Sequence, residues 1–248
     1  MTQDAYNFIG GLLILAFVYL IIYVIRLIKR KNYEKTEYYK QTQNEYSEAH
    51  GKNLGKSGEY HVSKVLESQP DQEGKRLYNL ILPTSSGTTE IDAIYINKHG
   101  LIVIENKNYS GWIFGSADKK QWTQVIYETK SRFYNPIFQN NTHCKALLSF
   151  LNVSQEQLHS VIVFSDKCVF KAIPGNTKQY SIIHRRDLSE YLVNIKLNTP
   201  VCLSAQQITE IYNKLYPLTQ SDQETKDKHI QQVREIKQSS AAHQQARQ

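Results

Sequence analysis

The sequence predicts an α/β fold with a mixed central β-sheet flanked by helices, preceded by one transmembrane helix. Three observations lead to this prediction. Residues 8–25 form an apolar run without a charge. Strand-like segments follow one another closely at residues 77–82, 90–96 and 101–105, and helical patterns flank this meander before another buried strand. The 248 residues are long enough for one such domain with appendages.

The apolar run extends from Phe8 to Ile25 and is 18 residues long. As a helix rising about 1.5 Å per residue, it nearly matches the hydrocarbon thickness of a bilayer. A cleaved signal peptide and a buried core helix are the alternatives. The acidic start at Asp4 argues against a signal peptide, and the lack of a polar face argues against a core helix.

Charge predicts the orientation of this helix, because basic residues favour the cytoplasmic side. The residues just after the run include Arg26, Lys29, Arg30, Lys31 and Lys35. We therefore expect a single-pass protein of the cell membrane, with the N-terminus outside and the C-terminal domain in the cytoplasm. The basic flank is also suited to contact anionic lipid head groups.

Cysteine usage agrees with a cytoplasmic domain. Cys144, Cys168 and Cys202 lie far apart and form no Cys-x-x-Cys pair. This spacing argues against a disulfide framework and against a structural zinc site, and it fits a reducing compartment.

Composition divides the chain into four parts. Residues 1–31 form the membrane anchor and its basic flank, and residues 32–50 are expected to be a polar, solvated stalk that is helical or frayed. Residues 51–217 form the folded domain. Residues 218–248 are rich in Gln and Lys with little apolar surface, so we expect a disordered or loosely helical tail.

The remaining elements follow from periodicity and capping. A helix is expected from Ser57 or Gly58 to Gln69, ahead of the three strands of the meander. The later elements are short strands at 112–114 and 122–127, a helix at 136–151 with Pro136 in its first turn, strands at 160–164 and 180–183, and helices at 187–193 and 205–215, the last capped by Ser204.

The central hairpin brings two carboxylates together. Asn97-Lys98-His99-Gly100 is a plausible tight turn, and closing it pairs Asp92 with Glu105 on one face of the sheet. Directly opposed Cβ atoms lie about 4.5–5.5 Å apart. Two carboxylates this close repel each other unless a cation or a proton lies between them.

Lys107 shares the face of Glu105, and the same register places it opposite Glu90. One interpretation is structural: a Glu90–Lys107 surface ion pair with two ordinary edge carboxylates. The other is a site for Mg²⁺, with Mn²⁺ as a possible substitute, because Mg²⁺ prefers oxygen ligands. Asp92, Glu105 and the backbone carbonyl of Asn106 would be its protein ligands, and Lys107 would stabilise charge on a phosphate or orient a water.

An acid on one strand followed by Glu-x-Lys on the next resembles the PD-(D/E)xK nuclease superfamily. The longer match resembles the nuclease-related domain, known as NERD, over residues 54–151. It consists of Gly58-Glu59, Thr89-Glu90-Ile91-Asp92, Glu105-Asn106-Lys107-Asn108-Tyr109-Ser110-Gly111, Trp122 and Asn135-Pro136-Ile137-Phe138-Gln139. The sequence departs from the superfamily name at Ile91, where the name has proline.

The resemblance implies a restriction-endonuclease-like fold, a nuclease activity that hydrolyses DNA or RNA, and two further site residues. Glu59 would be an additional acid near the metal, and Gln139 a polar helix residue facing the site. Each also has a structural interpretation, since a glutamate in the first turn of a helix is favoured by the helix dipole and Gln139 could simply be solvent-exposed.

Basic and aromatic residues alternate after the Glu-x-Lys strand. Such a mixture suits phosphate contacts and base stacking, but a half-buried hairpin with a solvated face has the same pattern. The residues are Lys119, Lys120, Lys130 and Arg132, with Trp112, Phe114, Trp122, Tyr127 and Phe133.

Two functions therefore remain. One is a membrane-anchored, magnesium-dependent nuclease, with Asp92 and Glu105 as metal ligands and Lys107 assisting. The other is a non-catalytic module of the same fold that binds nucleic acid or a protein at the membrane. No small-molecule cofactor is expected, and the sequence leaves the oligomeric state open. The five histidines of the domain lie in unrelated contexts without a nucleophile elbow, which argues against a Ser-His-Asp hydrolase.

Overall fold

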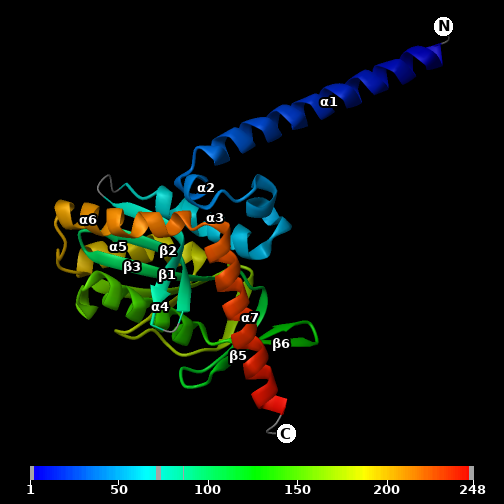
Figure 1. The fold of residues 1–248 in the computed structure, drawn as a ribbon. Helices are drawn as coiled ribbons and strands as arrows, with labels where there is room; N and C mark the ends of the chain where they lie inside the picture. The colour runs from blue at the N-terminus through cyan, green and yellow to red at the C-terminus, as the bar shows by residue number, and fades with distance from the viewer. Residues whose placement is uncertain (1–2, 71–73, 86, 246–248) are drawn as a thin grey trace.

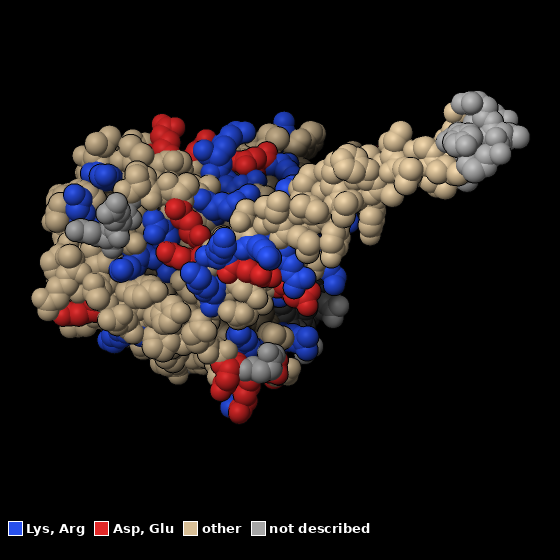
Figure 2. Space-filling model, turned by 90° about the horizontal axis from the view of Figure 1, so that it is seen from above, with Lys and Arg blue, Asp and Glu red and all other residues tan. Residues whose placement is uncertain are grey.

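A long N-terminal helix projects from a three-layered α/β/α domain in the computed structural model, which describes residues 3–70, 74–85 and 87–245 (Figure 1). The long helix, α1, spans Gln3–Glu34. Its apolar part, Ile9–Glu34, has the length and composition of a membrane span, and none of its most apolar window is buried against the rest of the chain. Lys and Arg side chains gather around the base of α1 (Figure 2).

The central sheet has five strands in the order β1-β2-β3-β7-β9. The first three, β1 (Lys75–Thr84), β2 (Gly87–Asn97) and β3 (Gly100–Lys107), form the antiparallel meander. β7 (Leu158–Phe164) and β9 (Ser181–His184) add in parallel. The sheet is therefore mixed, as predicted.

Helices cover both faces of this sheet. α3 (Leu54–Glu67) and α5 (Leu188–Asn198) pack on the face that carries Tyr95, Ile102 and Ile104. α4 (Pro136–Leu151) and α6 (Ala205–Leu215) pack on the opposite face, which carries Ile94, Ile96 and Val103. Alternation of side chains along each strand produces the two cores. The shorter 3-10 helices are Gln155–Gln157, Arg185–Asp187 and Tyr216–Gln220.

A second sheet lies beside the first, with the order β6-β5-β4-β8. Its strands are β4 (Gly111–Phe114), β5 (Gln121–Ile126), β6 (Thr129–Tyr134) and β8 (Cys168–Ala172). One face packs on the central sheet, where the Trp122 ring stacks on Phe164 with their centroids 6.2 Å apart. The sequence did not predict β6 or β8, because most side chains of these edge strands are exposed and lack an apolar alternation.

The stalk expected at residues 32–50 is partly helical, but it is packed against the domain and is not solvated throughout. This segment holds α2 (Glu37–Thr42) and a π-helical turn (Glu48–Lys52), and Tyr33 and Tyr38 are buried. Their rings contact Tyr60 of α3 and Tyr78 of β1. Tyrosine can bury its ring and keep its hydroxyl hydrogen-bonded, which explains how a polar-looking sequence packs against a domain.

The tail is helical, which is one of the two states expected for it, and it also contacts the central sheet. Residues Gln223–Gln245 form a helix, α7, which crosses the edge of β2. The Gln232 side chain accepts from the Thr88 amide at 3.0 Å and donates to the Thr88 carbonyl at 3.2 Å. His229 is buried and contacts Thr88 and Glu90. Backbone pairing by a side-chain amide leaves little sequence signal, because glutamine is also common in disordered tails.

Candidate active site

The six residues singled out from the sequence line one pocket. It has a volume of about 450 Å³ and lies where α3, β2, β3 and α4 meet. The six are Glu59, Asp92, Glu105, Asn106, Lys107 and Gln139. Residues far apart in the chain thus converge on one cavity, with Glu59 from α3, the Glu-x-Lys segment from β3 and Gln139 from α4.

The β-ladders on both sides of Asp92 are interrupted. The β2–β3 register follows the prediction from Asn97–Gly100 to Ala93–Ile104, and the ladder ends there. The β1–β2 ladder pairs residues before and after Asp92 but skips the pair of Asp92 with Asn79. Asn79 has a φ of 52°, which is uncommon for a non-glycine residue. β2 and β3 therefore part just before Asp92, so the ladder pair of Asp92 with Glu105 that the turn predicted does not form, whereas β1 and β2 skip only one pair.

The Asp92 side chain binds a backbone amide of β3 beyond the end of the β2–β3 ladder. Its Oδ2 accepts a hydrogen bond of 2.7 Å from the Asn106 amide. Because the N–H and C=O of one strand residue point to the same side, the Asn106 carbonyl faces Asp92 as well. Burial raises the pKa of the Asp92 carboxyl well above its usual range, and repulsion by Glu105 and Glu59 adds to the shift.

Glu105 is the most buried acid of the pocket, with 1% of its surface exposed. Its Oε1 lies 2.6 Å from Lys107 Nζ, and its Oε2 lies 3.0 Å from His143 Nε2. Burial alone would raise the pKa of Glu105, but the Lys107 ammonium and His143 outweigh it and lower that pKa. Lys107 also donates to Gln139 Oε1 at 3.0 Å, so Gln139 orients the lysine.

Glu59 accepts hydrogen bonds from the segment that follows α1 and from β1. Its Oε2 accepts from the Tyr38 hydroxyl at 3.0 Å and from Asn79 Nδ2 at 2.8 Å. Burial raises the pKa of Glu59 above its usual range despite these bonds. The Oδ1 atom of Asn79 is buried beside this carboxylate and has no hydrogen-bond partner among the described residues. An unpaired buried acceptor is costly and marks a place where a ligand or water is expected.

Gly58 explains why α3 approaches β3 so closely. A Cβ on Gly58 would lie 2.6 Å from both Asn106 Nδ2 and Asn108 Cβ. Only glycine leaves room for this contact, which sets Glu59 against the end of β3.

Comparison with known proteins agrees with this geometry. Residues 54–165 match the family model of the nuclease-related domain. An uncharacterized protein of Bacillus anthracis is 34% identical over 177 residues, covering 71% of this chain and 82% of that protein.

The chain belongs to the nuclease-related domain family. No solved structure matches it significantly. The matched segment of the nuclease-related domain begins with α3 and ends after β7, so it contains every residue that the sequence assigned to the pocket.

The donor chemistry of the pocket fits a hard divalent cation. Asp92, Glu105 and the Asn106 carbonyl are oxygen donors of the kind that Mg²⁺ prefers, completed by water. Among the described residues, no group of three or more His, Cys, Asp or Glu side chains is arranged to hold a metal ion. A metal in this nuclease-related domain would therefore depend on the two acids, the backbone and water, with the free lone pairs of Glu105 as donors.

Other residues expected from the sequence lie elsewhere. Glu90 does not pair with Lys107; its side chain is 44% exposed and lies 3.6 Å from His229. The separation at Asp92 ends the ladder before these two residues can meet. Trp122 is fully buried and Phe133 packs beside it, so both are structural. Trp112 and Tyr127 are exposed.

Sequence reasoning missed three partners of the site acids: Tyr38, Asn79 and His143. His143 bridges Thr89 and Glu105, with 2.8 Å to Thr89 Oγ1. It lies four residues after Gln139, one helical turn along the same face of α4, so a pattern of polar residues on that face was the available signal. Tyr38 and Asn79 gave no such signal, since their contacts depend on the tertiary fold.

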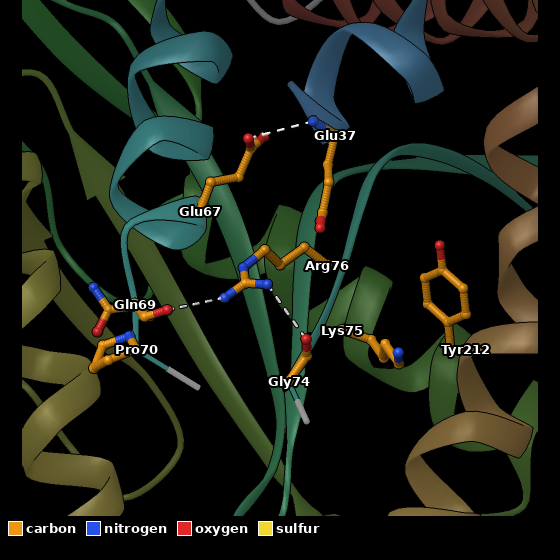
Figure 3. Close-up of a pocket in the computed structure, with 8 residues that line it drawn as sticks. All are labelled: Glu37, Glu67, Gln69, Pro70, Gly74, Lys75, Arg76 and Tyr212. Carbon is orange, nitrogen blue, oxygen red and sulfur yellow. Dashed lines mark hydrogen bonds between the residues drawn. The ribbon is translucent and has the colours of Figure 1, made fainter. Parts of the chain in front are cut away.

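A second cavity of about 430 Å³ lies between α2, the end of α3, β1 and α6 (Figure 3). Two of its charged side chains, those of Arg76 and Glu67, form hydrogen bonds with backbone groups. Arg76 donates to the carbonyls of Leu66, Gln69 and Gly74, which caps the end of α3. Glu67 accepts from the Tyr38 and Glu37 amides at the start of α2. We assign this cavity a structural role.

Proposed function

We propose that this protein is a membrane-anchored, metal-dependent nuclease that hydrolyses phosphodiester bonds. The observation that carries the proposal is the convergence of Glu59, Asp92, Glu105 and Lys107 on one open pocket. A purely structural domain gains nothing from gathering three carboxylates whose burial and mutual repulsion disfavour their charged forms.

The acids and the lysine have separate roles in this proposal. Asp92 and Glu105 would hold Mg²⁺ or Mn²⁺, which supplies Lewis-acid activation of water and of the phosphate. Lys107, which donates to Gln139, would stabilise the negative charge that builds up on the scissile phosphate. Glu59, which lines the same pocket, would add negative charge that attracts a cation when ionised.

The anchor positions this activity at a membrane. The apolar run of residues 8–25 is followed by exposed Arg26, Lys29, Arg30 and Lys31 in the C-terminal part of α1, so the domain would lie on the cytoplasmic side and the N-terminus outside. A tag at the N-terminus should be reachable from outside intact cells, whereas one at the C-terminus should not. The reverse accessibility would contradict this orientation.

Cleavage by the full-length protein in detergent tests the proposal. Labelled single- and double-stranded DNA and RNA would be incubated with Mg²⁺, Mn²⁺ or a chelator. We expect metal-dependent cleavage, reduced roughly 10²–10³-fold or more in Asp92→Ala and Lys107→Ala. Glu210→Gln, which removes a carboxylate on α6 away from the pocket, is the matched control and should cleave normally.

A non-catalytic binding module is the second candidate. It is favoured by one observation: both oxygens of Glu105 already contact a cationic or donor group of the protein itself. In that case Lys107 would serve as an internal counter-ion. Nucleic-acid binding without cleavage, unaffected by Asp92→Ala, would support this candidate over the nuclease.

A further inference from the structure

The second sheet has an outer face whose side chains are exposed or half-buried. Strand registers place its side chains in two rows that cross the strands. One row is Val169–Trp112–Val125–Lys130, and the other is Ala172–Phe114–Thr123–Arg132. The inner face of the same strands carries Ile113, Trp122 and Phe133, which pack in the core.

Each row changes from apolar to basic across the sheet. Trp112 is 51% exposed and Val169 is 49% exposed. Lys130 and Arg132 form the edge on β6, and Lys171 Nζ lies 4.6 Å from the centroid of the Trp112 ring. Neither row contains an acid. Exposed aromatic surface bordered by cations matches a ligand with flat apolar groups on an anionic chain.

We propose that this face binds a single-stranded stretch of nucleic acid. Unpaired bases would stack on Trp112 and Phe114, and phosphates would lie along Lys130 and Arg132. These two residues are two positions apart on one strand and point to the same side, so they would contact successive phosphates of an extended chain. A duplex keeps its bases stacked on one another and cannot present them to the sheet.

The same hairpin connects this face with the candidate active site. Gln124 and Ile126 of β5 line the pocket from the other side of the sheet. Tyr127, at the turn between β5 and β6, is 97% exposed and has a φ of 52°. An exposed aromatic residue in this conformation is uncommon and suits a contact at the tip. A strand that passes this tip would lead from the outer face to the pocket, an argument that rests on the proposed nuclease function.

Tryptophan fluorescence tests the proposal, because Trp112 and Trp122 are the only two tryptophans. Full-length protein in detergent with EDTA would be titrated with single-stranded and duplex oligonucleotides. We expect single strands to bind and to quench the exposed Trp112. Trp112→Ala should weaken binding roughly tenfold, as expected for losing one stacked base. Trp112→Phe should bind but lose the quenching, since only the buried Trp122 remains.

Charge variants provide a second readout. Removing both edge cations with Lys130→Gln and Arg132→Gln should lower the slope of log affinity against log salt by about 1.4, at roughly 0.7 per phosphate contact on a single strand. Lys145→Gln with Lys196→Gln removes two exposed cations from α4 and α5 and should leave the slope unchanged.

The outcomes separate this proposal from the nuclease itself. Unchanged affinity in Trp112→Ala, equal quenching in Trp112→Phe, or duplex bound as tightly as single strands would overturn the outer-face proposal. If one of these results is found and the protein still cleaves with metal, the outer-face proposal fails and the nuclease proposal remains. Binding and quenching as expected, without cleavage, would support the outer face and reject the nuclease.

Discussion

The hydroxyl of Tyr38 donates a 3.0 Å hydrogen bond to Oε2 of Glu59, which joins the segment after the N-terminal apolar helix α1 to the candidate active site. Asn44 Nδ2 in turn donates to the Tyr38 hydroxyl at 2.9 Å. Tyr33, at the end of α1, donates to the Asn44 carbonyl at 2.8 Å. The end of α1, the segment that follows it and one wall of the pocket are therefore joined by a continuous chain of hydrogen bonds.

Replacing Tyr38 with phenylalanine should impair catalysis more than folding. The ring remains buried, but Glu59 loses a donor, and a hydrogen bond to a charged group contributes about 1.5–3 kcal/mol. We expect cleavage to fall about tenfold and the metal concentration for half-maximal activity to rise. Tyr39→Phe, in the same aromatic cluster, is the control. Equal activity in both variants would show that Tyr38 does not position Glu59.

Truncation should reveal the same dependence. A chain that starts at residue 32 keeps Tyr33 and Tyr38, whereas one that starts at residue 51 exposes Tyr60 and Tyr78, whose rings those tyrosines cover. The shorter chain should unfold at a lower temperature, because large buried aromatic contacts are lost. Circular dichroism melts compare the two, and equal melting temperatures would refute a structural role of the segment.

Gly58 and Gly55 offer a matched pair within α3. Alanine at Gly58 would press on Asn106 and Asn108, so we expect the free energy of unfolding to fall by about 1–3 kcal/mol. Alanine at Gly55 meets only Asn53 Oδ1 at 3.4 Å and should stabilise the helix by up to about 1 kcal/mol. Denaturant unfolding measures both, and changes of the same sign would contradict the close approach of α3 to β3.

Asp92→Asn should abolish cleavage and yet stabilise the protein. The folded state raises the pKa of Asp92, so its charged form opposes folding above that pKa. Asparagine keeps an acceptor for Asn106 without the charge, and we expect a gain of roughly 1–2 kcal/mol at pH 7. The gain should shrink as the pH falls toward 3.8, the unfolded value, where wild-type Asp92 is protonated. A loss of stability at pH 7 would mean that the carboxylates do not repel.

His143→Ala should make the protein more sensitive to acid. The lowered pKa of Glu105 contributes stability above its unfolded value of 4.5, and this contribution disappears as the pH falls through the folded pKa. Without His143 the folded pKa of Glu105 rises, so acid unfolding should occur at a higher pH. His159→Ala is the control, because His159 contacts a backbone carbonyl and not a carboxylate. Identical acid midpoints would rule out this role of His143.

The elements nearest the site were the easiest to predict from sequence. The β2–β3 register from Asn97–Gly100 to Ala93–Ile104 follows from a short turn and two alternating strands, so the sequence alone brings Asp92 close to Glu105, although the ladder ends before they pair. The limits of α4 and α6 match as well, because Pro136 and Ser204 mark their starts.

The parts that could not be predicted depend on tertiary contacts. Tyr38 and Gln41 lie in a polar segment, yet the Gln41 amide pairs with the exposed edge of β1 by accepting from the Tyr78 amide and donating to the Arg76 carbonyl. The Gln232 side-chain amide likewise pairs with the backbone N–H and C=O of Thr88. Side-chain amides that replace a missing strand produce no hydrophobic period, so sequence patterns assign such segments to stalks and tails.

Cleavage of a labelled oligonucleotide by the full-length protein, with Mg²⁺ or Mn²⁺ and beside Asp92→Asn, tests the central claim most directly. The account predicts product only with metal and only from the wild type, while circular dichroism shows both proteins folded. Cleavage that persists in Asp92→Asn or in the presence of a chelator, or no cleavage by the wild type with either metal, would contradict it.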